Sequence, residues 1–575
     1  IKPISCVGAC NQVPLIDVAT NDGQIFRYPN IKSDEVKEIL LHHFRPASKL
    51  RRLRNAILNH IDNFHTDQTW DNILWTPEKE RTQKINTFLD GQYRISTEGY
   101  GHLNPHDIDE YVSLGGFEAL RKALLAMKRD EIIDEVLKSG IRGRGGGGFP
   151  TGRKWKLVAD ATSDDKKYVI CNGDEGDPGA FMDRILLESY PLRVIEGLII
   201  AAYAVGASEG IFYIRAEYPL AIHRLEVAIA QARECKLLGK NILGTDFSFD
   251  IELRYGAGAF VCGEETALTR SMEGKRGEPY VKPPFPSVRG YKDAPTNVNN
   301  VETFANICPI ILNGAKWFAS IGTEKSHGTK VFALAGKVNN VGLIEVPMGT
   351  TLRQVIFDIG GGIKGGKKFK AVQTGGPSGG CLTEKHLDTP IDYDNLIAAG
   401  SMMGSGGMIV MDEDNCMVAV AKFYLDFTVE ESCGKCAPCR IGNKRLYELL
   451  DKITKGCATM EDLQNLENLA KVIKDTALCG LGQTSPNPVL STLSNFRDEY
   501  LAHVVDHRCP AHQCASLVRY SINPDKCKGC TACARNCPVH AITGTVKNPH
   551  TINPETCIRC GSCVSRCKFG AITVE

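Results

Sequence analysis

One cysteine pattern, Cys-x2-Cys-x2-Cys-x3-Cys, occurs twice near the C-terminus of this chain. It comprises Cys527, Cys530, Cys533 and Cys537 in the first copy and Cys557, Cys560, Cys563 and Cys567 in the second. This spacing is typical of [4Fe–4S] clusters, and in such a repeat the fourth cysteine of each copy binds the other cluster. We therefore expect one cluster on Cys527, Cys530, Cys533 and Cys567, and another on Cys557, Cys560, Cys563 and Cys537. Neither copy can complete its cluster alone, so both must fold as one small unit.

The composition predicts a globular protein of several domains. The chain has 575 residues, 43% of them hydrophobic and 23% charged, which is ordinary for globular proteins. Its 23 cysteines occur in a chain too long for a small disulfide scaffold, so we expect a reduced, cytoplasmic protein. A net charge of +1 gives no indication of nucleic-acid binding. No secretory leader or membrane span is predicted, and the longest apolar run, residues 194–206, predicts a buried helix.

A third cluster site is expected upstream of the repeat. Cys433, Cys436 and Cys439 form a Cys-x2-Cys-x2-Cys triplet, and Cys479 follows after a helical segment. Three closely spaced thiolates with one distant ligand suit a [4Fe–4S] cluster, whereas tetrahedral zinc usually takes two pairs of ligands. The triplet precedes a predicted helix, whose N-terminal dipole favours an anionic cluster.

A short segment between these cluster sites mixes thiol and imidazole side chains. Its candidate zinc ligands are Cys509, Cys514, His503 and His512. Cysteine and histidine in this density suit a structural zinc ion. The alternative is that the histidines are ordinary solvated surface residues.

A glycine-rich loop near residue 145 predicts a nucleotide site. The motif Gly143-x-Gly145-x-x-Gly148 includes the cation Arg144. It is followed by the aromatic residues Phe149 and Trp155 and by the cation Lys154. Glycine lets the backbone approach a ligand closely, and successive N–H groups form an anion-binding concavity. Helical patterns over 117–128 and 131–139 precede the loop, so an ordinary Rossmann fingerprint, which requires a strand there, is rejected. A merely flexible glycine loop is the alternative.

Three further segments place polar side chains after predicted strands or glycines. Asn172 and Asp174 can hydrogen-bond a planar ring edge, while Glu175 and Asp177 suit ribose hydroxyls. The second segment contains Gly263, Glu264 and Glu265 and is followed by Lys282 and Phe285, and the third contains Asn299, Asn300 and Thr303. Strand ends commonly present such groups to a ligand, whereas a plain acidic turn would not explain their recurrence.

These four motifs, in this order, resemble the FMN- and NADH-binding flavoprotein subunit of respiratory complex I. They are also similar to the matching subunits of hydrogenases and formate dehydrogenases, and the likeness covers about residues 110–500. The resemblance implies FMN contacts at Gly143, Arg144, Gly145, Lys154, Asn172, Asp174, Gly263, Asn299, Asn300 and Thr303. It implies NAD contacts at Phe149, Glu175, Asp177, Glu264, Glu265, Lys282 and Phe285. The loop from Asn172 to Pro178 departs from the usual complex I form and is similar to the hydrogenase type.

The N-terminal residues resemble the second half of a thioredoxin-like [2Fe–2S] domain. Cys6 and Cys10 supply two of four ligands, and we expect the other two upstream of Ile1; an empty site or two surface thiols are the alternatives.

The predicted α/β multidomain chain comprises a partial thioredoxin-like domain (1–45), a linker (46–110), a complex I flavoprotein-like, non-classical Rossmann-like domain that binds FMN and NAD(H) (111–325), a ubiquitin-like β-grasp domain (326–415), a helical [4Fe–4S] domain (416–515) and a ferredoxin-like two-cluster domain (516–575). The ubiquitin-like domain is expected to be structural.

Together these domains are similar to the flavoprotein (beta) subunit of electron-bifurcating [FeFe]-hydrogenases. That resemblance implies a soluble hetero-oligomer, as a dimer of heterotrimers, with a hydrogenase catalytic subunit, a small thioredoxin-like [2Fe–2S] subunit and ferredoxin as partners, and neither nucleic acid nor membrane. Hydride transfer between stacked rings requires no acid–base group, so no catalytic residue is assigned. Glu175, Asp177 and Glu265 would repel a 2′-phosphate and favour NAD over NADP. The alternatives are the same module in a formate dehydrogenase or an NADP-reducing hydrogenase, and a non-catalytic electron relay without flavin.

Overall fold

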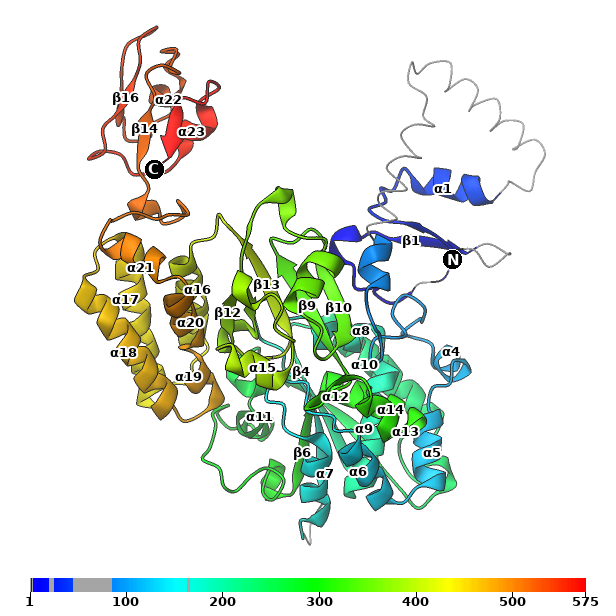
Figure 1. Cartoon of the computed structure of the whole chain (residues 1–575). Coiled ribbons are helices and arrows are strands. Elements are labelled where there is room, and N and C mark those ends of the chain that lie inside the picture. Colours follow the sequence, from blue (N-terminus) through cyan, green and yellow to red (C-terminus); the bar gives the residue numbers. More distant parts are fainter. Residues whose placement is uncertain (1, 3, 20–24, 45–84, 163–165, 575) are drawn as a thin grey trace, which may run out of the picture.

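The computed structural model describes residues 2, 4–19, 25–44, 85–162 and 166–574 (Figure 1). The central part of the chain is a parallel sheet with the order β5-β4-β3-β6. Its strands are β3 (Tyr168–Gly173), β4 (Glu209–Arg215), β5 (Asp250–Gly256) and β6 (Thr296–Asn300). In register, Ile170 of β3 lies beside Ile211 of β4 and Val298 of β6. The strands β3 and β4 are buried along almost their whole length, as expected for a parallel sheet covered on both faces.

Helices surround this sheet, and the central one is α9 (Pro191–Val205). All but one of its residues are buried, so the prediction of a buried helix over residues 194–206 is confirmed. It packs against α5 (Glu118–Ala126), α6 (Arg129–Lys138), α7 (Thr151–Asp160), α12 (Val301–Ala305) and strand β3. The further helices of this part are α4 (Ile108–Ser113), α8 (Met182–Ser189), α10 (Pro219–Glu234), α11 (Glu265–Met272), α13 (Ile307–Asn313) and α14 (Ala315–Ala319). Helix α6, not a strand, precedes the glycine-rich loop, which agrees with the rejection of a Rossmann fingerprint.

A second, mixed sheet follows, with the order β10-β9-β13-β11-β12. Its strands are β9 (Thr329–Gly336), β10 (Gly342–Pro347), β11 (Phe369–Thr374), β12 (Gly380–Thr383) and β13 (Gly407–Asp412). β13 runs parallel to β9, and the other neighbours are antiparallel. A short helix, Gln354–Ile359, and α15 (Tyr393–Ala398) accompany the sheet. This sheet occupies the residues for which the sequence predicts a ubiquitin-like domain.

The segment predicted as a linker, 46–110, lies outside the described residues up to 84, but its remainder is anchored by buried contacts. Glu345 on β10 accepts hydrogen bonds from the backbone N–H of Ser96 at 3.0 Å and of Thr97 at 2.9 Å. It also accepts from the hydroxyls of Ser96, Thr97 and Thr329. Five donors satisfy this buried carboxylate, so residues 85–110 are joined to the second sheet as part of the folded core.

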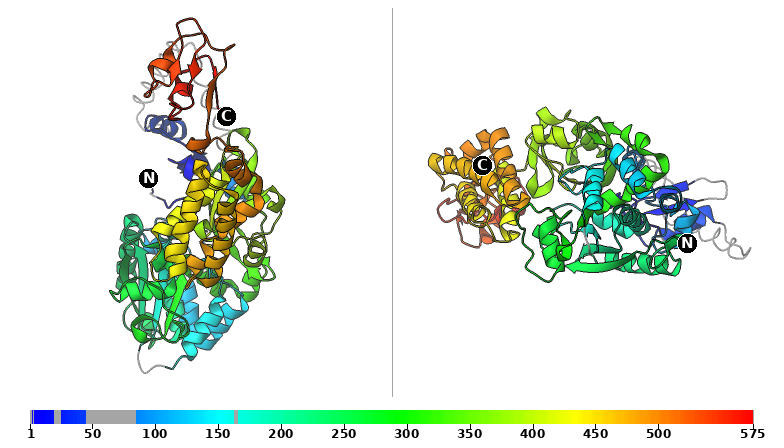
Figure 2. Two further views of the ribbon diagram at one scale, coloured as in Figure 1. Left: turned by 90° about the vertical axis from the view of Figure 1, so that its left-hand side faces the viewer. Right: turned by 90° about the horizontal axis from the view of Figure 1, so that it is seen from below.

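The C-terminal third consists of a helical domain and a small cysteine-rich module (Figures 1 and 2). The helices are α16 (Met417–Glu430), α17 (Asn443–Lys455), α18 (Met460–Thr476), α19 (Gly480–Thr484), α20 (Asn487–Asn495) and α21 (Arg497–Val504). The module contains β14 (Tyr520–Ile522), α22 (Ala532–Arg535), β15 (Ile542–Thr543), β16 (Thr551–Ile552), α23 (Ser562–Arg566) and β17 (Ile572–Val574). β14 pairs with β17, and β15 with β16, so both copies of the cysteine repeat belong to one unit. Figure 1 shows this module at the tip of the helical domain, beyond α21.

The N-terminal segment forms β1 (Ile16–Ala19), β2 (Ile25–Tyr28) and α1 (Val36–His43). Its first turn lies against the second sheet, because the N–H of Leu343 on β10 donates to the Gly8 carbonyl at 2.8 Å. Among the helices of the described residues, none combines the length and the apolar character needed to cross a membrane.

Candidate functional site

A cavity of about 460 Å³ opens at the carboxyl ends of β3 and β6. This is the edge of a parallel sheet at which ligands of open α/β folds bind, and the volume suits a small-molecule or cofactor site. Its lining contains the predicted residues Gly143, Gly145, Phe149, Lys154, Asn172, Asp174, Glu175, Asp177, Gly263, Glu264, Glu265, Lys282, Asn299 and Asn300. Arg144, Thr303 and Phe285 are not part of the lining.

The glycine-rich loop forms one wall of the cavity. Its base is closed by a hydrogen bond from the Gly143 N–H to the Phe149 carbonyl at 2.9 Å, and Tyr393 donates to the Gly143 carbonyl at 2.8 Å. Within the described part of the chain, the N–H groups of residues 145–148 donate no hydrogen bond. Four free donors in succession fit an anionic phosphate group, and α7 begins directly after them at Thr151.

Two glycines of this loop cannot be replaced without strain. Gly148 has a φ of +62°, and an added Cβ would lie 2.7 Å from the ring of Tyr393. Gly146 has a φ of +113°, and its added Cβ would lie 3.0 Å from the backbone of Gly404. The loop therefore adopts a backbone that only glycine permits here.

Arg144 supports the loop from behind, because its side chain is fully buried. Its backbone N–H donates to the Thr303 hydroxyl at 2.9 Å. Its guanidinium donates to the carbonyls of Arg142 at 3.0 Å and His327 at 2.7 Å. The two predicted residues Arg144 and Thr303 thus bind each other, and they hold the loop in place from outside the cavity.

The loop after β3 places carboxylates with different surroundings at the cavity. Asn172 donates to the Gly263 carbonyl at 2.9 Å and accepts from the Asp174 N–H at 3.0 Å. The Asp174 carboxylate is buried, and neither oxygen has a hydrogen-bond partner among the described residues. Burial raises the pKa of Asp174 to about 7. Such orphaned oxygens in a cavity wall fit a ligand that offers hydrogen-bonding groups.

Glu175 and Asp177 are each engaged by the protein itself. Glu175 accepts from the N–H groups of Asp183 and Arg184, both at 3.1 Å, at the start of α8. Asp177 accepts from the Ser405 hydroxyl at 2.5 Å. Burial raises the pKa of each carboxyl to about 6.

Two lysines neutralise the acids on the opposite side of the cavity. Lys154 contacts Glu265 at 3.2 Å and the Val298 carbonyl at 3.0 Å. Lys282 lies between Glu264 at 3.1 Å and Glu265 at 3.2 Å. Burial disfavours ionisation of Glu265, but the two lysines outweigh it and lower the pKa of this carboxyl. Glu265 is therefore paired, which weakens its predicted repulsion of a 2′-phosphate.

Aromatic rings lie at the open side of the site. Phe149 lines the cavity and is 43% exposed, and Phe285 is 54% exposed outside the lining. The exposure of Phe149 leaves one face of its ring available for stacking.

The second sheet supplies a cavity wall that the sequence does not predict. Ser378, Met402, Gly404 and Ser405 come from this part of the chain and line the cavity. The expectation that residues 326–415 are only structural is therefore incomplete. The Gly404-Ser405-Gly406-Gly407 stretch was the available signal, since close backbone approach requires glycine.

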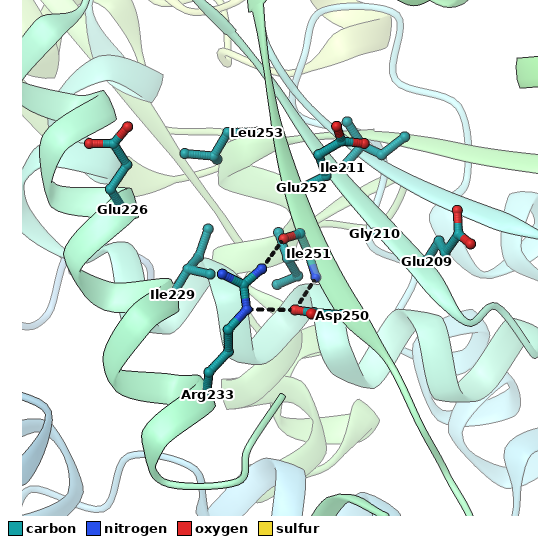
Figure 3. Close-up of a pocket in the computed structure, with 10 residues that line it drawn as sticks. All are labelled: Glu209, Gly210, Ile211, Glu226, Ile229, Arg233, Asp250, Ile251, Glu252 and Leu253. Atoms are coloured by element: carbon teal, nitrogen blue, oxygen red, sulfur yellow. Dashed lines mark hydrogen bonds and ion pairs between the residues drawn. The ribbon is translucent and has the colours of Figure 1, made fainter. Parts of the chain in front are cut away.

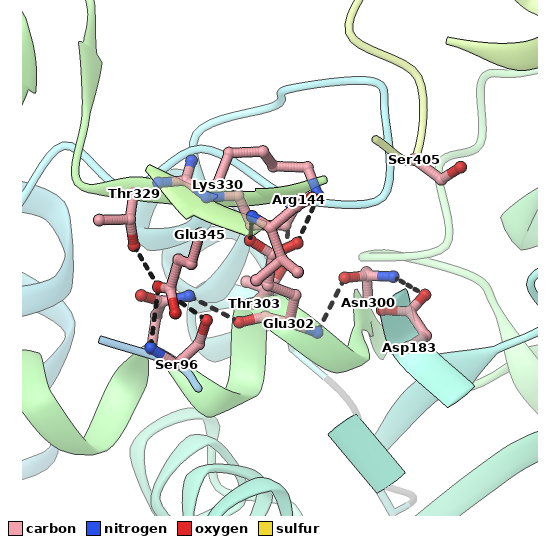
Figure 4. A network of polar contacts seen from close by, with 12 residues as sticks. Ser96, Arg144, Asp183, Asn300, Glu302, Thr303, Thr329, Lys330, Glu345 and Ser405 are labelled. Atoms are coloured by element: carbon pink, nitrogen blue, oxygen red, sulfur yellow. Dashed lines mark hydrogen bonds and ion pairs between the residues drawn. The ribbon is translucent and has the colours of Figure 1, made fainter. Parts of the chain in front are cut away.

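A buried polar network connects this wall to the parallel sheet of the central part (Figure 4). Lys330 on β9 and Glu302 on α12 form an ion pair with side chains 0% and 1% exposed. Glu302 also accepts from the Val331 N–H at 2.9 Å. The backbone N–H of Glu302 donates to the side-chain oxygen of Asn300 at 2.9 Å. The side-chain amide of Asn300 in turn donates to the Asp183 carboxylate at 2.5 Å. The network thus fixes the cavity residue Asn300 relative to β9.

The four cysteines of the predicted middle cluster converge beside the cavity. Cys479 caps α19 and Cys439 precedes α17, and an added Cβ on Gly482 would lie 3.5 Å from the Cys439 sulfur. The charges of Cys433, Cys436 and Cys479 all act on the Cys439 thiol. Gly480, Leu481 and Thr484, in the helix that follows Cys479, line the cavity. A cluster on these thiols would adjoin that cavity.

In the C-terminal module, two separate hollows are each lined by four cysteines. One contains Cys527, Cys530, Cys533 and Cys567, and the other Cys537, Cys557, Cys560 and Cys563. These sets are the ones that the crossed ligation pattern groups together.

At the N-terminus, the Gly8 N–H donates to the Cys6 sulfur at 3.3 Å, and Cys10 begins a short helix on the same turn.

A group of three thiols and one imidazole lies between α16 and α21. Its members are Cys416, His503, Cys509 and Cys514, all buried, with ligand atoms within 4.8 Å of one another. The His503 Nε2 is 3.4 Å from the sulfurs of Cys416 and Cys514, while its Nδ1 contacts the Glu499 carbonyl at 2.7 Å. That contact orients the imidazole ring towards the sulfurs.

The predicted ligand His512 is not a member of this group. It is exposed on a turn with a φ of +53°, and Cys416 occupies the fourth position. Cys416 lies far from the other three in sequence, so spacing alone could not identify it.

Another hollow lies at the opposite end of the sheet (Figure 3). It is lined by polar groups at the start of β4 and β5, including Glu209 and Asp250, and by Arg233 of α10. Arg233 donates to Asp250 at 2.9 Å and to the Ile251 carbonyl at 2.8 Å. Arg233 and Asp250 are paired with each other and Glu209 with Lys166, so this hollow is not a candidate site.

Comparison with known proteins identifies three matched families. The Nuo51 FMN-binding domain matches residues 136–309, the NADH-ubiquinone oxidoreductase-F iron-sulfur binding region matches 419–503, and the 4Fe-4S dicluster domain matches 519–568. The NADP-reducing hydrogenase subunit HndC of Solidesulfovibrio fructosivorans is 64% identical over 459 residues, or 80% of this chain and 93% of that relative. A subunit of the NADH-quinone oxidoreductase of Escherichia coli (strain K12) is 41% identical over 69% of this chain and 89% of its own length. The structure of an NAD+-reducing [NiFe]-hydrogenase in the H2-reduced state matches with a TM-score of 0.63 and 35% identity over 74% of this chain and 72% of that chain.

Proposed function

The chain belongs to the family of FMN-binding iron–sulfur subunits of complex I and related hydrogenases, and on that premise we propose that it is the NAD(H)-binding flavoprotein subunit of an electron-bifurcating hydrogenase. As a member of this family it is an oxidoreductase that uses NAD(P)H, FMN and [4Fe–4S] clusters. The observation that carries the proposal is the position of Gly480, Leu481 and Thr484, which follow Cys479 and line the cavity. FMN, when bound, would exchange one hydride, which carries two electrons, with NAD(H) and single electrons with clusters.

The proposed roles of the chain's own residues follow from their positions at the cavity. The free N–H groups of residues 145–148 bind the FMN phosphate. Asn172 and Asp174 face the ring edge, and Phe149 stacks on the nicotinamide nucleotide. Because only positioning is required, no residue of the chain serves as a general acid or base.

The nucleotide preference depends on fewer acids than the sequence predicts. Glu175 is occupied by two N–H donors and Glu265 by two lysines. The proposed preference for NAD(H) therefore rests mainly on Asp177, which lines the cavity and whose carboxylate, within the described residues, accepts hydrogen bonds from Ser405 alone. An NADP-reducing hydrogenase subunit is the second candidate function, favoured by the name of the 64% identical relative.

The proposed electron exits are three [4Fe–4S] clusters and one [2Fe–2S] cluster. The ligand sets are Cys433, Cys436, Cys439 and Cys479; Cys527, Cys530, Cys533 and Cys567; Cys557, Cys560, Cys563 and Cys537; and, for the incomplete [2Fe–2S] cluster, Cys6 and Cys10. Several exits from one flavin suit a branching of electrons between ferredoxin and a partner hydrogenase subunit. We place the chain in a hetero-oligomer with that subunit and a small [2Fe–2S] subunit, in the cytoplasm.

The branching proposal predicts that hydrogen production requires two donors. The whole complex should evolve hydrogen rapidly only when NADH and reduced ferredoxin are supplied together, because in this direction the branching runs in reverse and each turnover takes electrons from both donors. Gas chromatography of the headspace would measure the rate. Equal rates with and without reduced ferredoxin would contradict branching, while leaving NADH oxidation at FMN intact.

We also propose zinc at Cys416, His503, Cys509 and Cys514, since three thiolates and one imidazole form a closed tetrahedral set. The Cys416→Ala chain is expected to lose about one zinc per chain, measured by plasma mass spectrometry of the purified protein. Cys235→Ala, which removes an exposed thiol, should keep the wild-type zinc content. Unchanged zinc in Cys416→Ala, or no zinc in the wild type, would contradict this site.

A further inference from the structure

Arg215, the last residue of β4, joins two loops at the edge of the nucleotide cavity. Its guanidinium donates to the Glu175 carbonyl at 3.1 Å and to the Gly258 carbonyl at 2.8 Å. The first carbonyl belongs to the loop after β3, and the second to the loop after β5. The side chain is 15% exposed, so both bonds are shielded from water. One side chain therefore connects the carboxyl ends of three neighbouring strands.

The glycines in both loops leave space for this guanidinium. A Cβ added to Gly176 would lie 2.5 Å from the Arg215 Nη1. A Cβ added to Gly258 would lie 1.8 Å from the Glu217 carboxylate and 3.2 Å from the Arg215 Nη2. The two loops thus approach Arg215 as closely as a backbone can.

Arg215 also faces the carboxylate in the cavity wall that has no hydrogen bond from the described residues. Its Nη1 lies 3.8 Å from the Oδ1 of Asp174, whose side chain is 1% exposed. This separation is too long for a hydrogen bond but short enough for a strong charge interaction. Burial raises the pKa of Asp174 to about 7, Arg215 opposes that rise, and the nearby carboxylates of Glu217 and Glu431 add to it.

The other charges that act on Asp174 are all negative. Besides Arg215 of β4, the titratable neighbours are Glu217, Glu431 after α16, Tyr213 of β4 and Cys262 before α11. Each of these, when ionised, carries negative charge. Within the described residues that act on this carboxyl, Arg215 alone favours the ionised form.

We propose that Arg215 is a positioning residue of the flavin site: it fixes the two loops and supplies the positive charge that faces the Asp174 carboxylate. This inference rests on the proposed function. An ionised Asp174 accepts a hydrogen bond from a ring N–H, whereas a protonated one donates to a ring carbonyl. Arg215 thereby determines which edge of a bound ring the cavity wall favours.

The test is a pH titration of Asp174 in the full chain by difference infrared spectroscopy. The carboxyl band of the protonated form is assigned by its loss in Asp174→Asn. In the wild type it should disappear with a midpoint at about 7. In Arg215→Gln the midpoint should rise by about one pH unit or more, because removal of a nearby opposite charge favours the neutral acid.

Two further variants separate charge from loop geometry. Arg215→Lys keeps the positive charge but removes the planar guanidinium, whose two Nη groups donate to the two loop carbonyls. It should retain the wild-type midpoint while weakening FMN binding, measured by flavin fluorescence, several-fold. Arg233→Gln removes a guanidinium that also binds one carboxylate and one carbonyl, at the far end of the sheet, and should change neither quantity.

The outcomes distinguish this inference from the proposed function. A midpoint in Arg215→Gln equal to that of the wild type would overturn the inference, even if FMN binds normally. A wild-type chain that binds no FMN would overturn the proposed function, while the infrared shift would still report on Arg215. If Arg215→Gln does not fold, a shifted midpoint in Arg215→Lys would equally contradict the assigned role of charge.

Discussion

Lys330→Met is expected to lower the local stability of the flavin domain by about 3–5 kcal/mol, because it leaves a buried carboxylate without its cation. Lys330 and Glu302 are almost completely buried, and they belong to β9 and α12. After the substitution, Glu302 would retain the Val331 N–H at 2.9 Å as a donor but would lose its ion pair. Hydrogen exchange of peptides from α12 and β9 measures the free energy of opening directly.

The loss in Lys330→Met should depend on pH. Burial raises the pKa of Glu302, and Lys330 opposes that rise. Without Lys330 the folded state binds a proton more tightly than the unfolded state does. Stability of the variant must then fall as pH rises above the ordinary range of a glutamate and recover on acidification.

Two controls keep this prediction specific to the buried pair. Lys330→Met with Glu302→Gln should recover most of the loss, because no unpaired charge remains. Lys367→Met removes an exposed ion pair with Asp414 and should leave exchange at α12 unchanged. Equal protection of α12 in Lys330→Met and wild type would contradict the role of the ion pair.

Cys479→Ala is expected to separate flavin reduction from electron transfer along the chain. The variant should lose about four irons per chain and keep FMN, because the free N–H groups of the glycine loop lie elsewhere on the cavity. NADH should still bleach the flavin, while reduction of the two C-terminal clusters should fall below detection by rapid-freeze electron paramagnetic resonance. The reason is that Gly480, Leu481 and Thr484, which follow Cys479, line the cavity, so a cluster on Cys479 would adjoin it.

Cys457→Ala is the matched control for Cys479→Ala, since Cys457 is an exposed thiol of the same helical domain. It should retain iron, flavin and cluster reduction. Normal reduction of the C-terminal clusters in Cys479→Ala would show that electrons leave the flavin by another route.

The sequence predicts those features that depend on local spacing. Cluster cysteines lie within short motifs because one cluster imposes its geometry on a few neighbouring residues. The structure accordingly groups Cys527, Cys530, Cys533 and Cys567 in one hollow, as the crossed pattern requires. The strand end that carries Asn172 was likewise recognisable, because an apolar run ends there in polar residues.

Features that join distant segments could not be predicted in this way. Cys416 enters the thiol–imidazole group from the start of α16, far from His503 in sequence. Ser405 reaches Asp177 from a domain expected to be only structural. The sequence predicts that the Glu175 carboxylate binds ribose hydroxyls, yet it accepts hydrogen bonds from two backbone N–H groups of α8. Each of these contacts depends on tertiary packing, which no local pattern encodes.

The central claim is that one cavity brings NAD(H) to a flavin beside the cluster on Cys433, Cys436, Cys439 and Cys479. Anaerobic stopped-flow mixing of the purified chain with NADH tests it most directly, with flavin bleaching and cluster reduction followed together. Bleaching should come first, and cluster reduction should follow with matching kinetics. A chain loaded with FMN and iron whose flavin stays oxidised in the presence of NADH and NADPH would contradict the claim.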